Sequence, residues 1–136
     1  MTFKEAYDDI LKMYLDATSG QSWTNHWEAV DVLRATGNTP FATVVVKHTD
    51  GRTASLGGVG HRNFLREGML MVALYFPAGK GLSEAYAGAK IVADAYEGKS
   101  SENNVWFRNV RINEQGVMGR FFQIDVLVDF EYYETK

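Results

Sequence analysis

The sequence predicts an α+β fold, with a mostly antiparallel β-sheet and an N-terminal helix and a second helix packed on one face. Two observations predict it. Apolar residues recur every three to four positions in two segments, 3–17 and 83–96, whereas the regions that follow each segment carry strand patterns. The order along the chain is therefore helix, strands, helix, strands. At 136 residues, we expect one domain that spans residues 1–136.

The first helix is expected to begin at Thr2, because Thr2 and Glu5 have the spacing of a capping box. Its apolar face is then predicted to run until Gly20 ends the helix. That face comprises Phe3, Ala6, Tyr7, Ile10, Leu11, Tyr14 and Ala17. Residues 21–40 show no regular period and are interpreted as an irregular connector, in which residues 30–33 are a candidate edge strand.

A β-hairpin is predicted next, over residues 41–56. The β-branched residues of 41–47 favour a strand, Asp50 and Gly51 are typical of a hairpin turn, and residues 52–56 can pair back. A glycine-containing loop is then expected to run to Glu67, and a central strand with two apolar faces to follow it.

The second helix is expected to be capped by Ser83 and to end at Gly98. Its alanines indicate that it lies close against the sheet. Two final strands are predicted at 106–112 and 120–133, joined by a turn at 114–116.

Strict alternation in the last strand separates two kinds of side chain. One face is predicted to be core and comprises Phe122, Ile124, Val126, Val128, Phe130 and Tyr132. The other face carries Asp125, Asp129 and Glu131. These carboxylates fit two interpretations, an ordinary solvated face or the lining of a ring's lumen, through which DNA phosphates would pass without binding.

Composition excludes several classes of function. A formal charge of −3, from 14 basic and 17 acidic residues, argues against a general nucleic-acid binder. The absence of cysteine excludes disulfides, thiol nucleophiles and iron–sulfur sites. The longest apolar run, residues 69–76, is too short to cross a bilayer, and the first residues show no export signal, so we expect no membrane partner.

No catalytic, metal or cofactor site is predicted. His26, His48 and His61 are dispersed and lack the spacing of metal ligands, and no serine lies in a nucleophile-elbow motif. The glycine-rich run before Arg62 lacks the Lys-Ser/Thr ending of a phosphate loop. We instead expect a role for the surface of this loop. Arg62, Phe64 and Arg66 are predicted to contact a sister subunit or a tube, because aromatic and arginine side chains are frequent at the centre of protein interfaces.

Short segments spread over most of the chain carry a family resemblance. They are residues 53–62 (TASLGGVGHR), 67–68 (EG), 76–81 (FPAGKG), 105–108 (VWFR), 121–126 (FFQIDV) and 130–132 (FEY). Their order and spacing resemble the phage tail-terminator-like family, the tail completion proteins of long-tailed bacteriophages. Residues 21–38 follow the family pattern poorly.

The resemblance implies an α+β subunit that assembles as a ring, typically of six copies, on the last turn of the tail tube. Such a ring ends tube growth and offers a surface to the head–tail connector or head completion protein. DNA only passes through its lumen, and the family has no catalytic residues. The implied location is the head-proximal end of the phage tail in the virion, after assembly in the host cytoplasm. Exposed sheet edges and a projecting loop would suit such ring closure.

Two alternatives remain open. The first is a small-molecule-binding or isomerase-like α+β domain, whose pocket between helix and sheet would be lined by Trp23, Trp27, Tyr75 and Trp106. The second keeps the phage setting and makes the chain a connector adaptor on the head side.

Overall fold

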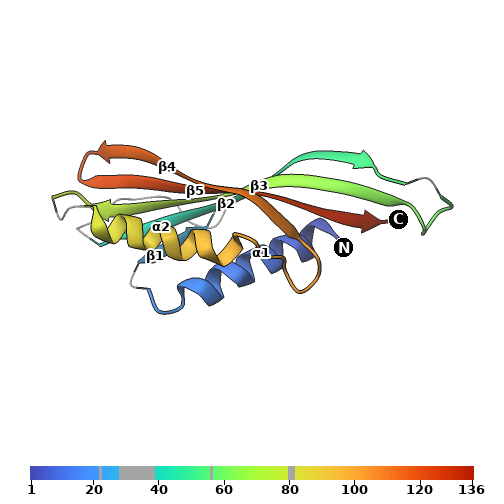
Figure 1. The fold of residues 1–136 in the computed structure, drawn as a ribbon, viewed down its shortest axis with the longest axis horizontal. Coiled ribbons are helices and arrows are strands. Elements are labelled where there is room, and N and C mark those ends of the chain that lie inside the picture. Colours follow the sequence, from blue (N-terminus) through green and yellow to red (C-terminus); the bar gives the residue numbers. More distant parts are fainter. Residues whose placement is uncertain (22, 28–38, 56, 80–81) are drawn as a thin grey trace.

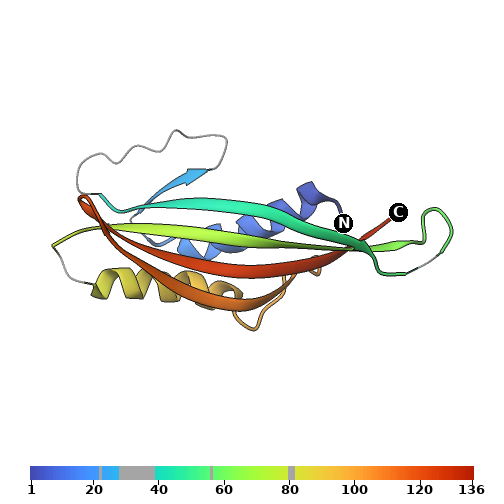
Figure 2. The same cartoon turned by 90° about the horizontal axis from the view of Figure 1, so that it is seen from above.

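The computed structural model describes residues 1–21, 23–27, 39–55, 57–79 and 82–136. The elements are α1 (Phe3–Thr18), β1 (Thr24–Trp27), β2 (Phe41–Thr53), β3 (Asn63–Pro77), α2 (Ser83–Tyr96), β4 (Trp106–Met118) and β5 (Phe121–Thr135). The strands form one sheet in the order β1-β2-β3-β5-β4, in which only the β1–β2 pair is parallel. Both helices lie on one face of this sheet, and the view from above shows the strands lying over them (Figures 1 and 2). The predicted α+β fold is confirmed.

Helix α1 begins as its sequence predicts. The Thr2 amide donates to Glu5 Oε2 at 2.8 Å, and the Glu5 amide donates to Thr2 Oγ1 at 3.2 Å, which completes the capping box. Ala6, Ile10 and Tyr14 are buried against the sheet and α2. After α1, the region predicted to be irregular contains strand β1, while the candidate edge strand at 30–33 lies outside the described residues.

The predicted hairpin turn at Asp50-Gly51 is wrong. Strand β2 continues through both residues, which pair with Glu67 and Arg66 of β3 after a register shift at residues 48–50. The chain reverses at residues 54–62 instead, so Phe64 and Arg66, expected in a loop, belong to β3. The physical reason is that a bulge at Thr49 shifts the register by one residue, after which Asp50 and Gly51 pair with β3 as part of a longer ladder.

Two other local predictions are also wrong. Ser83 does not cap α2: the N-cap is Leu82, and no side chain caps the helix. The turn predicted at 114–116 is a bulge within β4, because Gly116 has a φ of +93° beside a register shift, and the reversal lies at residues 119–120. In the β2–β3 pair and in the β4–β5 pair, a glycine that would fit a turn, Gly51 or Gly116, instead lies in a strand next to a bulge.

The core lies between the sheet and the two helices. All six residues of β5 that alternation assigned to the core are buried. The Tyr96 hydroxyl of α2 donates to the Ile10 carbonyl of α1 at 2.9 Å, which joins the helices beneath the sheet. Helix α2 approaches closely at Gly88, where an added Cβ would lie 2.9 Å from the ring of Phe76. The expectation that small residues let this helix lie close to the sheet is therefore correct.

A glycine in the centre of the sheet is equally constrained. A Cβ at Gly68 of β3 would meet both the Lys47 carbonyl and the Phe130 ring, which packs over the glycine from the neighbouring strand. We expect Gly68→Ala to lower the free energy of unfolding by about 2 kcal/mol, because the Lys47 carbonyl cannot shift away from the new methyl group without disturbing the sheet. Urea denaturation measures this. Gly58→Ala is the matched control, since nothing lies within 4 Å of its Cβ position. An equal effect of both substitutions would contradict the packing argument.

Candidate functional site

The sheet face turned away from the helices is termed the open face. It is formed by alternate residues of β2, β3, β5 and β4. One end is aromatic: the Phe41 ring stacks on Tyr75 at 4.5 Å and meets Phe121 edge-on at 5.1 Å. At the other end, Trp106 and Tyr133 lie edge-to-face at 5.9 Å and are 41% and 46% exposed. Phe41 and Phe121 are buried, so of these two aromatic groups only the Trp106–Tyr133 pair exposes much apolar surface.

A ladder of ion pairs crosses the open face between these aromatic ends. Glu67 of β3 lies 3.4 Å from the Arg52 guanidinium of β2 and 3.6 Å from that of Arg108 of β4. Arg108 also pairs with Glu131 of β5 at 2.8 Å. Four strands are joined in this way, although each bridging arginine is about half exposed, so the ladder stabilises the fold only modestly.

The three carboxylates predicted to share a face do share the open face, but they are not alone there. Glu131 is paired as described, and Asp129 lies 3.5 Å from Arg111. Asp125, only 5% exposed, accepts hydrogen bonds from two glutamine amides, Gln115 at 3.0 Å and Gln123 at 2.9 Å. These donors offset much of the negative charge, so the strand repels phosphates less than its sequence suggests. Their placement in a ring's lumen stays a prediction.

The far end of the sheet, termed the arm, comprises residues 50–55, 57–67 and 131–136. It projects past both helices, and its loop forms one tip of the molecule (Figures 1 and 2). Strand length explains it. Helices of 14 and 16 residues span roughly 21–24 Å at 1.5 Å per residue, whereas a strand of 15 residues spans roughly 50 Å. The helices therefore cannot cover the whole sheet.

Arg66 holds the base of the arm to the start of α1. Its Nε and NH2 groups donate to Glu134 Oε1 at 3.1 Å and 2.9 Å, and both side chains are largely buried. The guanidinium also lies over the rings of Phe3 and Phe64, at 5.5 Å and 5.3 Å from their centroids. Arg66 and Phe64 are thus engaged within the chain, and neither is a freely presented contact residue.

His48 belongs to the same cluster. Its ring stacks on Phe3 at 4.4 Å, and its Nε2 lies 2.7 Å from the Tyr132 hydroxyl. Burial lowers the pKa of His48, and the nearby Arg66 guanidinium lowers it further, while Glu134 acts in the opposite direction. Burial also raises the pKa of Tyr132 to about 12. Histidine thus contributes here as a neutral aromatic group, and sequence analysis missed this role because it sought metal ligands.

Arg62 is the member of the predicted trio that the arm presents outward. Its Nε donates to the Gly57 carbonyl at 2.7 Å, and its backbone pairs with Lys136 in both directions, at 3.0 Å and 2.9 Å. These bonds order the loop, while the Arg62 side chain stays exposed. Val59, at the tip, is 87% exposed. The contact of these three residues with a sister subunit or a tube stays a prediction, and of the three Arg62 is the most exposed.

The aromatic pocket required by a ligand-binding alternative is not assembled. Trp23 packs beside Phe76 on the helix side of the sheet, whereas Tyr75 and Trp106 lie at opposite ends of the open face. Trp27 meets Tyr14 edge-on, again on the helix side. The four aromatics face two sides of the sheet and do not converge on one ligand.

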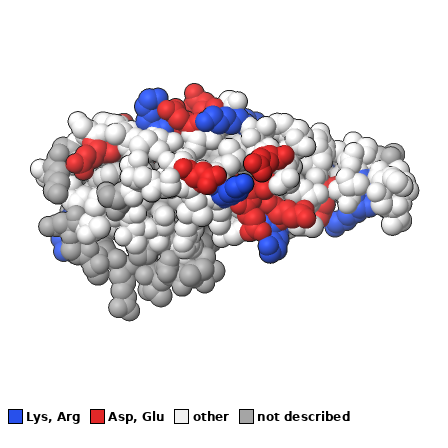
Figure 3. Space-filling model, turned by 90° about the horizontal axis from the view of Figure 1, so that it is seen from below, with Lys and Arg blue, Asp and Glu red and all other residues white. Residues whose placement is uncertain are grey.

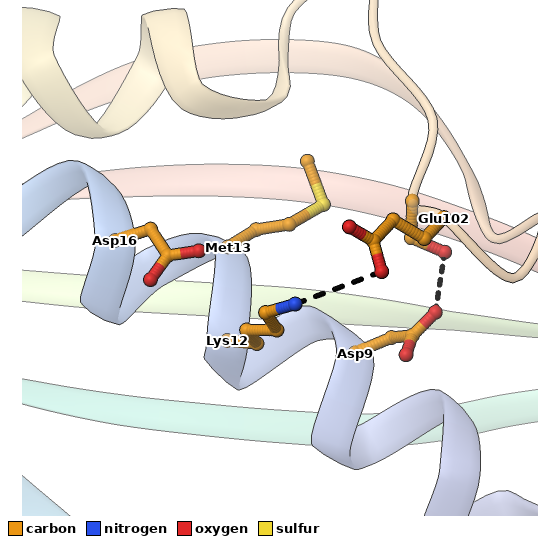
Figure 4. Close-up of a pocket in the computed structure, with 6 residues that line it drawn as sticks. Asp9, Lys12, Met13, Asp16 and Glu102 are labelled. Carbon is orange, nitrogen blue, oxygen red and sulfur yellow. Dashed lines mark hydrogen bonds and ion pairs between the residues drawn. The ribbon is translucent and has the colours of Figure 1, made fainter.

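A small hollow of about 70 Å³ lies between α1 and the connection from α2 to β4 (Figure 4). Asp9 accepts a hydrogen bond from Ser101 at 2.7 Å, and Lys12 lies 3.6 Å from Glu102. This volume is well below the roughly 300 Å³ that binding sites for small molecules usually enclose. The two polar contacts join α1 to the connection between α2 and β4. In the described part of the chain, no group of three histidine or acidic side chains could hold a metal, and no helix is long and apolar enough to span a membrane.

Comparisons with known proteins give structural information alone. No protein-family model matches the chain, and no curated protein matches it. Among solved structures, 23 chains match. One of them, with a name that states no function, superposes with a TM-score of 0.69 over 100% of this chain and 98% of its own length, at 15% sequence identity. At this identity, the likeness shows a shared fold over the full chain.

The His48 cluster predicts a response to acid. In the unfolded chain the pKa of His48 is near its ordinary 6.5, and in the folded chain it is lower. Between these values only the unfolded chain binds the proton, so stability is full above pH 6.5 and falls as pH decreases toward the folded-state pKa. Melting temperatures from about pH 8 to about pH 5 should show a smaller loss in His48→Gln than in the wild type. His61→Gln, at an exposed loop histidine, is the control. Equal losses in His48→Gln and the wild type would refute this assignment.

Proposed function

We propose that this chain is a structural tail-terminator subunit of a long-tailed bacteriophage, and not an enzyme. Copies form a ring, with six as the expected number, that caps the tail tube and ends its growth. The partners are the tube protein on one side and the head–tail connector or head completion protein on the other. DNA passes through the lumen. The subunit resides at the head-proximal end of the tail in the virion, after assembly in the host cytoplasm.

One observation carries the proposal: the sheet is covered by helices on one face only and projects beyond them as an arm. A subunit of this shape presents a broad surface and a projecting arm to its neighbours. Exposed apolar side chains add to this, with Trp106 and Tyr133 on the open face and Val117, 66% exposed, on the edge strand β4. Contact surfaces between proteins are enriched in such aromatic groups and in arginine, which the ladder supplies.

Edge strand β4, and the part of β2 beyond its pairing with β1, are shaped against simple strand pairing between copies. Strand β4 has two register shifts, and Asn109, within the first of them, has a positive φ of 53°. Strand β2 has its own shift at residues 48–50. Bulges of this kind interrupt the row of free backbone groups that a second sheet would need. We therefore place the ring contacts on faces and on the arm, and not along continuous strand edges.

The proposal predicts assembly that microscopy can detect. Incubating the purified chain with growing tail tubes of its own phage should give ring-shaped particles and capped, shorter tubes in negative stain, because a ring on the growing end blocks further addition. Tubes that polymerise without the chain are the control. Single-chain particles with and without tubes, and tubes of unchanged length, would contradict the proposal.

The location can be tested separately. Antibody labelling of intact virions should mark the head-proximal end of the tail. Label confined to the head vertex would favour an adaptor on the head side, and no label on virions would remove the phage assignment. A ligand-binding enzyme would instead show a melting temperature that rises with a small molecule.

A further inference from the structure

The tip of the arm carries cationic and apolar groups with few contacts to its own chain. Residues 51–66 include three arginines and no acidic residue. Two of these arginines, Arg52 and Arg66, pair with carboxylates of the sheet, which leaves the exposed Arg62 beside Val59. The tip, defined here as residues 57–62, thus presents a positive charge next to an apolar side chain that is 87% exposed.

The outer side of α1 has the complementary character. Besides its buried face, the helix carries a second apolar stripe, defined as Tyr7, Leu11 and Leu15, with Tyr7 38% and Leu15 46% exposed. Spacing of four residues aligns these side chains along the helix surface. Asp8 and Asp16, both exposed, follow the first and last of them. Figure 3 shows carboxylates on the helix side of the molecule, with lysine or arginine side chains beside several of them. Asp8 pairs with Lys4 at 2.6 Å, whereas Asp16 makes no ion pair with another described residue.

The tip cannot reach this stripe within one chain. It lies beyond the N-terminal end of α1, whereas Leu15 lies near the other end of the helix (Figures 1 and 2). The stripe and the tip both expose apolar side chains, and their charges are opposite, yet the rigid sheet holds them apart. Their contact therefore requires two molecules.

We infer that the tip of one copy docks on the α1 stripe of the next copy, with Val59 against Tyr7, Leu11 and Leu15 and with Arg62 near Asp16. This deepens the proposed function and rests on it. Two different surfaces meet, so each copy uses its tip on one neighbour and its stripe on the other, and such a heterologous contact closes into a ring when the rotation allows.

Substitutions at the two surfaces test the contact. Val59→Asp and Arg62→Glu should each weaken ring formation at least about tenfold in sedimentation experiments, the equivalent of one lost interface contact. Their melting temperatures should change little, because both residues are exposed and the one side-chain hydrogen bond lost, from Arg62 to the Gly57 carbonyl, is confined to the loop. Combining Arg62→Glu with Asp16→Arg should restore assembly, since the charges are then exchanged. Lys90→Glu on the exposed side of α2 is the control and should assemble as the wild type.

The chain has no cysteine, which permits a direct test by cross-linking. Oxidation of a Val59→Cys, Leu15→Cys double variant should give a ladder of covalent multimers, whereas Val59→Cys with Lys90→Cys should not. No ladder, or equal ladders in both, overturns the docking.

Ring formation in Val59→Asp and Arg62→Glu as strong as in the wild type also overturns the docking but leaves the proposed function standing. Failure of the charge exchange to restore assembly removes α1 as the partner of Arg62. A wild type that never forms rings, alone or with tubes, overturns the docking and the proposed function together.

Discussion

Cover of a long sheet by two shorter helices on one side is the constraint on which the rest of this structure depends. Strands β3 and β5 are each 15 residues long, and their inward side chains require cover. Two helices of ordinary length supply it over part of the sheet, joined to each other by the Tyr96–Ile10 hydrogen bond. The uncovered length becomes the arm, and the uncovered side becomes the open face. Both features thus follow from a mismatch between strand length and helix length.

Each uncovered region is stabilised by polar groups as well as apolar ones. The arm is fixed at its base by Arg66, which binds Glu134 and lies against two aromatic rings. The open face is crossed by the ladder centred on Glu67 and Arg108. Charges at these places are matched within the chain, whereas Arg62 and the stripe of α1 remain exposed. This division separates groups that hold the subunit together from groups that are free to contact a neighbour.

The same division bears on the lumen hypothesis. An acidic strand in a bore works by repulsion, which requires carboxylates without local counter-charges. Arg108 and Arg111 supply such counter-charges to Glu131 and Asp129. A mixed surface of this kind is better suited to contact with another protein, where alternating charges fix register and orientation.

The sequence by itself determined the features that depend on near neighbours. The Thr2–Glu5 capping box and the two faces of β5 were predictable because capping and strand alternation act over two to four residues. Only the tertiary structure decided the rest. Asp50 and Gly51 lie inside β2, and Phe64 and Arg66 lie in the arm's base, because the register with β3 and β5 sets their partners. Which arginine neutralises which carboxylate is likewise fixed by cross-strand register. Arg52 pairs with Glu67 and Arg66 with Glu134 across neighbouring strands, and no local sequence pattern encodes that pairing.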